Sequence, residues 1–205
     1  MDYDYTKKVY RAWSGVYDFT FKNLFYPRQS YAISSMNISP GEKVLDVGIG
    51  TGMALSCYPG DCEVTGIDLS ASMLKKAEVK VAKYGLDNVK LREMDACNLN
   101  FEDNTFDHVI ATFLISVVPD PVRALSEMKR VCKKDRPVVL VNHFMSSNKM
   151  VAWLEKTFDP VCRKIGWRNT LNLAELMGAV NLQVDSCTRM KKFDLWSIVF
   201  ATNTK

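Results

Sequence analysis

The chain has 205 residues, of which 47% are hydrophobic and 24% are charged, as expected for one globular domain with a full hydrophobic core. Its formal net charge of +4 suits an anionic ligand or a membrane surface, whereas the absence of a zinc-ligand spacing or an RNA-binding signature argues against a metal site and a nucleic-acid partner. No apolar run approaches the roughly 20 residues that span a bilayer, and six cysteines without a CxxC pair favour buried thiols in a reducing cytoplasm.

Residues 1–36 are predicted to form a helical segment that is unusually rich in aromatic side chains. Ten of the 22 aromatic residues lie in the first 31 positions, and Tyr10, Trp13, Tyr17 and Phe21 recur at helical spacing. Charged side chains follow the same period on another face, and rings together with basic groups suit the headgroup layer of a membrane. We therefore expect an amphipathic helix that docks on the domain's own core, covers the site as a lid, contacts a membrane surface, or combines these roles.

The remaining core, residues 37–205, alternates apolar runs with helical patterns. Strands are predicted at 43–48, 63–69, 89–95, 106–113 and 137–144, and helices at 70–84, 121–133 and 148–164. The last two apolar runs, 182–190 and 195–203, are separated by a gap too short for a helical crossover, which favours an antiparallel hairpin. The pattern predicts a single α/β domain over 1–205, with a seven-stranded, mostly parallel sheet and helices on both faces.

The segment "VLDVGIGTGMA" (44–54) carries the strongest chemical signal. Gly48, Gly50 and Gly52 follow a strand, and glycine lets the backbone turn tightly and approach a ligand. Asp68 ends the next strand, where a carboxylate accepts hydrogen bonds from both ribose hydroxyls of a nucleoside. A dinucleotide site would carry a glycine at position 53, which is methionine here, and Asp46 would repel a pyrophosphate but favour a cation. The loop thus favours S-adenosylmethionine over NAD.

Four segments together carry a family resemblance: "VLDVGIGTG", "GIDLSASML", "MDACNLNFEDNTFDHVIATF" and "PDPVRALSEMKRV". In order and spacing they resemble the class I S-adenosylmethionine-dependent methyltransferases. This resemblance implies a Rossmann-like sheet, S-adenosyl-L-methionine as donor and S-adenosyl-L-homocysteine as product, with no metal. The donor-binding residues that it implies are Tyr17, Asp46, Gly48, Gly50, Thr51, Gly52, Asp68, Leu69, Met73, Asp95, Ala96 and Thr112. The family usually has a Lys-Pro-Gly-Gly-type turn before the fifth strand, where this chain has "KKDRPVV", so that turn stays uncertain.

The segments "RAWSGVYDFTF", "SVVPDP", "VLVNHF" and "GWR" are similar to the small bacterial phosphatidylethanolamine N-methyltransferases. That resemblance implies a cytoplasmic, peripheral membrane enzyme that methylates the ethanolamine nitrogen of a phospholipid towards phosphatidylcholine. A quinone C-methyltransferase of menaquinone or ubiquinone biosynthesis, which shares "VYD", is the main alternative, beside other small-molecule methyltransferases. A dehydrogenase or a non-catalytic nucleotide-binding module is a remote alternative. The number of methyl groups added and the oligomeric state stay open.

Five residues are candidates for handling the acceptor. His143 stands at the end of the predicted fifth strand. Because histidine is the side chain that ordinarily exchanges a proton near neutral pH, His143 is the candidate that takes the proton from the substrate ammonium, with Asn142 beside it. Tyr17 and Tyr26 offer aromatic faces for methylated ammonium groups. Arg168 could hold the lipid phosphate through two hydrogen bonds. The structural alternatives are a core histidine, a core tyrosine and a surface arginine.

Overall fold

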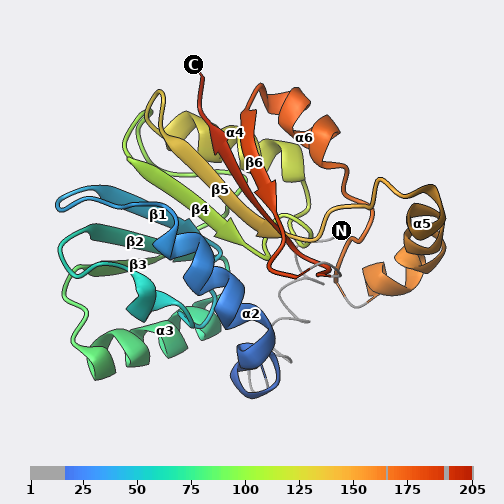
Figure 1. Cartoon of the computed structure of the whole chain (residues 1–205). Helices are drawn as coiled ribbons and strands as arrows, with labels where there is room; N and C mark the ends of the chain where they lie inside the picture. The colour runs from blue at the N-terminus through green and yellow to red at the C-terminus, as the bar shows by residue number, and fades with distance from the viewer. Residues whose placement is uncertain (1–16, 165, 192–193, 205) are drawn as a thin grey trace.

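The computed structural model describes the backbone of residues 17–164, 166–191 and 194–204, and the side chains of these ranges from residue 23 onward. Seven strands form one sheet in the order β3-β2-β1-β4-β5-β7-β6 (Figure 1). Their bounds are β1 Lys43–Val47, β2 Glu63–Asp68, β3 Val89–Glu93, β4 His108–Thr112, β5 Pro137–Asn142, β6 Gln183–Thr188 and β7 Ser197–Thr202. The first five strands run parallel, and β7 is antiparallel to both β5 and β6, which confirms the predicted sheet and the final hairpin.

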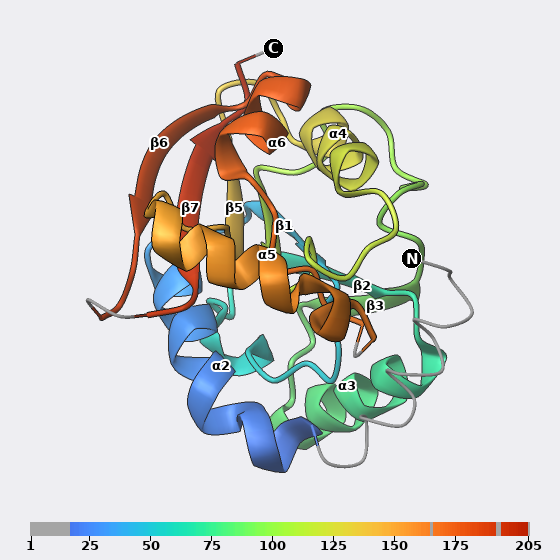
Figure 2. The same cartoon turned by 90° about the vertical axis from the view of Figure 1, so that its right-hand side faces the viewer.

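Helices cover both faces of the sheet (Figures 1 and 2). They are α2 Tyr17–Ser34, the short 3-10 helix η1 Leu55–Cys57, α3 Ala71–Tyr84, α4 Pro121–Val131, α5 Lys149–Lys164 and α6 Leu173–Val180. α4 begins as predicted at Pro121, whose ring suits the first turn, and the Asp120 side chain accepts a hydrogen bond from Arg123 N at 3.0 Å. α6 was not predicted.

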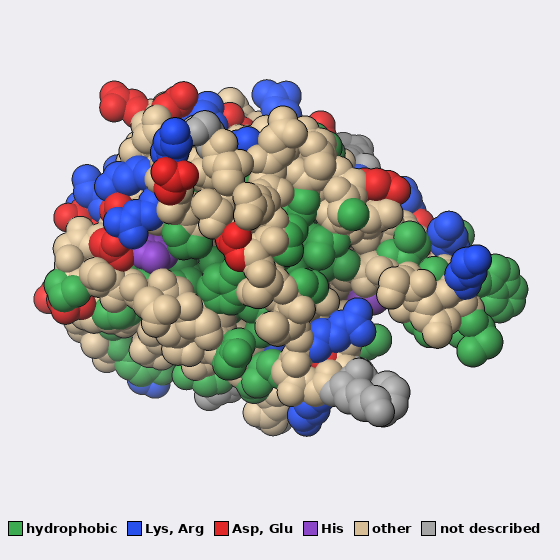
Figure 3. Space-filling model, turned by 45° about the horizontal axis from the view of Figure 1, so that its top comes forward, with side chains coloured by type: hydrophobic (Ala, Val, Ile, Leu, Met, Phe, Trp, Pro, Cys, Tyr) green, Lys and Arg blue, Asp and Glu red, His purple; other side chains and the backbone are tan. Residues whose placement is uncertain are grey.

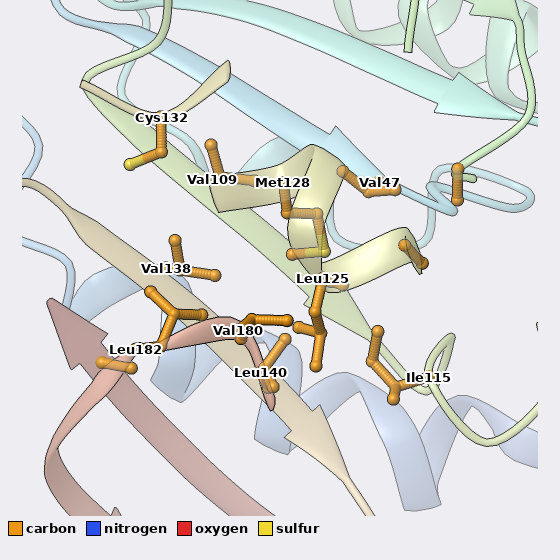
Figure 4. Close-up of a cluster of buried hydrophobic side chains, with 14 of the residues drawn as sticks. Val47, Val109, Ile115, Leu125, Met128, Cys132, Val138, Leu140, Val180 and Leu182 are labelled. Atoms are coloured by element: carbon orange, nitrogen blue, oxygen red, sulfur yellow. The ribbon is translucent and has the colours of Figure 1, made fainter. Parts of the chain in front are cut away.

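Alternation along β5 explains how the two faces are filled. Val138 and Leu140 pack in a cluster with α4 and α6, whereas Val139 and Val141 pack in a second cluster with α2. Figure 4 shows the first cluster, in which Leu125 of α4 lies over the sheet. Because both faces of the strand are covered, the sequence of β5 is a continuous apolar run up to Asn142.

The N-terminal helix partly agrees with its prediction. Tyr10 and Trp13 lie outside the described residues, and α2 extends to Ser34 through Pro27. Ala32 and Ile33 are buried in the second cluster, so the carboxyl half of α2 docks on the domain's own core. The expected lid and membrane contact fall mainly on the part of the segment that the structure does not describe.

Two observations bear on the expectations from composition. In the described parts of the chain, no helix combines the length and apolarity needed to cross a bilayer. All six cysteines are free thiols; Cys62, Cys97 and Cys132 are buried as expected, whereas Cys187 is exposed.

Candidate active site at the carboxyl edge of the sheet

A pocket opens where β1, β2, β3 and β4 end. Its empty volume is about 870 Å³, part of it open to solvent. Parallel strands bring their carboxyl ends to one edge, so residues far apart in sequence meet there. Eight of the predicted donor-binding residues line this pocket: Gly48, Gly50, Asp68, Leu69, Met73, Asp95, Ala96 and Thr112.

The three glycines of the loop differ in the atoms that surround them. All three have positive φ, +77° at Gly48, +56° at Gly50 and +67° at Gly52. A Cβ added to Gly52 would lie 3.0 Å from Ala77 Cβ and 3.2 Å from Ala77 Cα, so this glycine lets α3 pack closely against the loop. A Cβ on Gly50 would meet no atom within 4 Å, and Gly50 lines the pocket. Gly52 therefore serves packing, whereas Gly50 keeps ligand space free.

Asp68 joins the glycine loop to the end of β2. Its Oδ2 accepts a hydrogen bond from Gly50 N at 2.9 Å, and its Oδ1 accepts one from Ser70 N at 2.8 Å. Burial raises the pKa of Asp68, while these two N–H donors oppose that rise. Each carboxylate oxygen can accept a second hydrogen bond, so Asp68 can hold the loop and still receive ribose hydroxyls.

Asp46 is a buried carboxyl group at the base of the same loop. Tyr58 Oη donates a hydrogen bond to its Oδ2 at 2.8 Å, and its buried Oδ1 has no hydrogen-bond partner among the described residues. Burial raises the pKa of Asp46 to about 7. A buried carboxyl oxygen without a hydrogen-bond partner, at the base of this loop, can accept a hydrogen bond from a ligand or pair with a cation.

The raised pKa of Asp46 predicts a pH-dependent stability. Between about pH 4 and pH 7 the unfolded chain ionises this carboxyl before the folded chain does, so its contribution to stability falls as pH rises through that window and stays low above it. Each pKa unit corresponds to about 1.4 kcal/mol. The free energy of unfolding of Asp46→Asn should therefore decrease less steeply with rising pH across this window. Urea unfolding of both proteins from pH 4 to pH 8 measures the difference, and parallel curves would contradict the assignment.

Two threonines of the predicted donor site differ in position. Thr51 is a buried residue of the glycine loop, and its Oγ1 accepts a hydrogen bond from Lys80 Nζ at 3.2 Å. Thr112 lines the pocket and accepts a hydrogen bond from Gln29 Nε2 of α2 at 2.8 Å. The buried Gln29 Oε1 has no hydrogen-bond partner among the described residues, so α2 contributes a polar group that the sequence analysis missed.

An aromatic cluster is built around Phe113, a residue that lines the pocket. Phe113 lines the pocket, has φ of +58° and stacks on Phe25 of α2 with ring centroids 4.2 Å apart. Trp196 meets both rings edge-on, at 5.7 Å from Phe25 and 6.1 Å from Phe113. A left-handed backbone at a bulky residue is unusual and often marks a functional site. Sequence reasoning missed this cluster; the only local signal was an aromatic residue directly after the fourth strand.

His143 occupies a different place from the one expected. It is buried, with Nδ1 2.7 Å from the Leu195 carbonyl and Nε2 3.1 Å from the Asn169 carbonyl. Nε2 also lies 3.3 Å from Glu155 Oε1 of α5. His143 is not among the described residues that line the pocket, so the geometry gives no support to its predicted role as proton acceptor. It instead connects β5 to three other segments.

Asn142 is also held by the protein itself. Its Nδ2 donates to the His143 carbonyl at 2.8 Å, and its Oδ1 accepts a hydrogen bond from Ser116 Oγ at 3.4 Å. This buried amide is not among the described lining residues. The geometry favours a structural role at the end of β5.

Arg168 lies at the rim of the pocket. Its Nη2 donates to the carbonyl of Pro119, a lining residue, at 2.7 Å, and its buried Nε has no hydrogen-bond partner among the described residues. Burial lowers the pKa of Arg168. A partly buried guanidinium beside a lining residue is a candidate partner for an anion at the edge of the pocket, through N–H groups other than the buried Nε.

Of the two tyrosines expected near the acceptor, the structure describes the side chain of Tyr26 alone. Tyr26 Oη accepts a hydrogen bond from Cys57 Sγ of η1 at 3.5 Å, and this contact raises the pKa of Tyr26. Tyr26 is not among the described lining residues. Tyr17 begins α2, and its side chain lies outside the described part of the chain.

Comparison with known proteins agrees with this geometry. A family model described as a methyltransferase domain matches residues 45–140, from β1 to β5. The phosphatidylethanolamine N-methyltransferase of Cereibacter sphaeroides is 39% identical over 200 residues, covering 97% of this chain and 98% of that protein. The chain belongs to the S-adenosylmethionine-dependent methyltransferases. Their methyl donor, S-adenosyl-L-methionine, fits a pocket that places the Asp68 carboxylate and the open side of Gly50 together.

Two other relatives show how far the similarity extends. The demethylmenaquinone methyltransferase of Staphylococcus epidermidis is 43% identical to this methyltransferase over 115 residues, covering 54% of the chain and 47% of that protein. The structure of Haemonchus contortus phosphoethanolamine N-methyltransferase 2 aligns with a TM-score of 0.75 at 19% identity, covering 94% of this chain and 57% of the other. The latter similarity supports the fold.

Proposed function

We propose that this methyltransferase transfers methyl groups from S-adenosylmethionine to the ethanolamine nitrogen of phosphatidylethanolamine, towards phosphatidylcholine. The observation that carries the proposal is the 39% identity to the Cereibacter sphaeroides enzyme along nearly the whole of both chains. The demethylmenaquinone methyltransferase of Staphylococcus epidermidis matches only about half of the chain, so it supports a shared acceptor less than the nearly full-length match does.

The donor site is proposed to follow the pocket. Gly48 and Gly50, which line the pocket, border the methionine part of the donor, with Asp46 behind them, and Asp68 accepts hydrogen bonds from the ribose. Gly52, predicted beside the same part, contributes by letting the loop pack against α3. Leu69 and Met73 are proposed to flank the adenine, Asp95 to meet its amine with Ala96 beside it, and Thr112 to lie near the methionine. Thr51 is proposed to hold the loop to α3 through its hydrogen bond with Lys80.

The acceptor is proposed to enter beside Phe113. The bound donor supplies an electrophilic methyl group on its sulfonium. The Phe113 ring, which lines the pocket and stacks on Phe25, offers an aromatic surface that holds a methylated ammonium at about 0.5–2 kcal/mol per contact. Arg168 at the rim is proposed to bind the lipid phosphate. Alignment of the amine and the methyl group in one closed space can supply roughly 7–11 kcal/mol of the barrier.

The substrate ammonium must lose a proton before it can attack. Asp68 and Asp95 are the ionisable residues among the described lining of the pocket, and both accept hydrogen bonds from backbone N–H groups. We therefore propose that the proton passes to water at the open mouth, and that His143 acts on the amine only indirectly, by fixing the end of β5.

The enzyme is proposed to work at the cytoplasmic surface of a membrane as a peripheral protein. The aromatic and basic pattern of residues 1–36 supports this placement. Tyr17, at the start of α2, and Tyr26 stay candidates for contacts with the donor or the methylated headgroup from that segment.

One assay tests the proposed reaction. The full chain is incubated with methyl-labelled S-adenosylmethionine and vesicles that contain phosphatidylethanolamine, demethylmenaquinone, or both, and the extracted lipids are separated. We expect label in N-methylated phosphatidylethanolamine and in its further methylated products. Label in the quinone alone would favour the alternative C-methylation. Donor binding with no labelled product from either acceptor would leave a nucleotide-binding module and contradict the proposal.

A further inference from the structure

Helix α5 exposes an apolar face. None of its residues is buried, and the most exposed large side chains are Met150 at 71%, Trp153 at 64%, Val161 at 60% and Phe158 at 58% of their full accessible area. These positions fall on one side of the helix, since they recur at intervals of three to five residues. Of the 14 large hydrophobic side chains that are exposed in the described chain, six belong to this helix: Met150, Val151, Trp153, Leu154, Phe158 and Val161.

The polar side of α5 faces the protein. Glu155 accepts a hydrogen bond from Ser146 N at 2.8 Å, and its side chain also approaches His143. The Glu155 carbonyl accepts a hydrogen bond from Asn169 Nδ2 at 2.8 Å, and Thr170 Oγ1 donates to Asp159 at 3.2 Å. An amphipathic surface helix ordinarily buries its apolar side and exposes its polar side. In α5 the polar side contacts the protein and the apolar side is exposed, so the apolar face is available to a partner.

The charges of α5 indicate the kind of partner. Four exposed basic residues belong to the helix, Lys149, Lys156, Arg163 and Lys164, of which Arg163 pairs with Asp159 at 2.5 Å. The two carboxylates of the helix, Glu155 and Asp159, also accept hydrogen bonds from Ser146 and Thr170 in the body of the protein. Figure 3 shows hydrophobic side chains with Lys or Arg beside them at the right-hand end of the molecule, where α5 lies. A tryptophan and a phenylalanine flanked by cations match an interface rich in anionic lipid headgroups.

The position of α5 relates this face to the pocket. The helix lies beyond the carboxyl ends of β4 and β5, on the side of the sheet where the pocket opens (Figures 1 and 2). The chain that follows α5 carries Arg168, which hydrogen-bonds to Pro119 at the pocket rim. A bilayer that contacts α5 would therefore lie near the mouth through which the acceptor enters.

We propose that the apolar face of α5, formed by the six exposed side chains from Met150 to Val161, is a docking surface for anionic lipid bilayers. The choice of a bilayer as occupant rests on the proposed function, but binding itself requires no methyl transfer. On docking, Trp153 and Phe158 insert among the lipid chains while the neighbouring cations meet the headgroups.

The test uses vesicles of phosphatidylcholine and phosphatidylglycerol, which contain no amine acceptor. Trp153→Ser with Phe158→Ser in the full chain should lower vesicle binding in a sedimentation assay by at least ~10-fold, because each side chain contributes apolar surface to the bilayer. The matched control is Val79→Ser with Tyr84→Ser on α3, whose side chains are 67% and 53% exposed. It should bind vesicles like the unchanged protein. Thermal unfolding of all three proteins establishes that the variants are folded.

The outcomes separate this proposal from the proposed function. Loss of vesicle binding in the α5 variant alone supports the docking surface even if no lipid is methylated. Equal binding of the folded α5 variant and the unchanged protein would overturn it, and would leave residues 1–36 as the membrane contact. Failure of the unchanged protein to bind vesicles, with dimers in gel filtration that the α5 variant lacks, would assign the face to a second copy of the chain and also overturn the proposal.

Discussion

Asp68→Ala is expected to lower the affinity for S-adenosylmethionine by about 100-fold or more. The substitution removes the proposed acceptor of the ribose hydroxyls, and hydrogen bonds to a charged group contribute about 1.5–3 kcal/mol each. It also deprives Gly50 N and Ser70 N of their acceptor, so the loop itself loses its link to the end of β2. Isothermal titration of the full chain with S-adenosylmethionine measures the effect.

Asp107→Ala is a suitable control because the Asp107 carboxylate also accepts hydrogen bonds, but at the amino ends of the strands, away from the pocket. Asp107 accepts hydrogen bonds from Lys43 N at 3.0 Å and from Lys133 Nζ at 2.7 Å, beyond the amino ends of the strands. Its loss should cost stability and leave donor affinity within about twofold, because its contacts lie away from the pocket. If Asp68→Ala binds the donor as tightly as Asp107→Ala does, Asp68 does not hold the ribose.

Gly50→Ala should separate ligand binding from folding. The new Cβ meets no protein atom within 4 Å, so the cost to folding is the left-handed backbone strain of about 1–2 kcal/mol. Because Gly50 lines the pocket, its added methyl group occupies ligand space, and the affinity for S-adenosylmethionine should fall by at least ~10-fold. Urea unfolding and calorimetric titration of the same variant measure the two effects.

Two other glycines provide the comparison. Gly41→Ala has the same open surroundings and positive φ, +77°, but precedes the amino end of β1, so it should show similar strain with unchanged affinity. Gly52→Ala places its Cβ against the Ala77 backbone, so its main cost should be about 1–3 kcal/mol of stability from overpacking. Equal donor affinity in Gly50→Ala and Gly41→Ala would refute the placement of Gly50 against the donor.

The parts that sequence predicted best depend on local patterns. The apolar runs identified the strands, and the order of strands and helices placed their carboxyl ends at one edge, which brought Gly48, Asp68, Asp95 and Thr112 into one pocket. Each of these residues ends a strand or follows it within two positions. Their position therefore follows from topology and needs no knowledge of side-chain packing.

The parts that sequence missed depend on contacts between distant segments. Gln29 and Thr112 are 83 positions apart, and the stacking of Phe25 on Phe113 likewise joins α2 to the end of β4. No periodicity in either segment reveals such a contact. His143 illustrates the converse: strand alternation could not show that the carbonyls of Leu195 and Asn169 would occupy both of its ring nitrogens.

Two local features also escaped prediction. α6 has only eight residues, and its start depends on the Asn172 side chain, which accepts hydrogen bonds from Ala174 N and Glu175 N. The uncertain turn before β5 is formed with Asp135 at φ +56°, where the related family usually has glycine. Aspartate tolerates this conformation better than most residues, so the turn survives the substitution.

The antiparallel direction of β7 has a practical consequence. Thr202 pairs with Pro137, the first residue of β5, so the chain leaves the sheet at the edge opposite the pocket and α5 (Figure 1). Asn203 anchors this exit by donating to the carbonyl of Cys132 at 2.8 Å. A label or immobilisation tag added after Lys205 would attach the molecule to a sensor chip at the end opposite the pocket. The pocket would then face the flowing solution. Lipid capture and donor binding could then be recorded on the same oriented layer of protein.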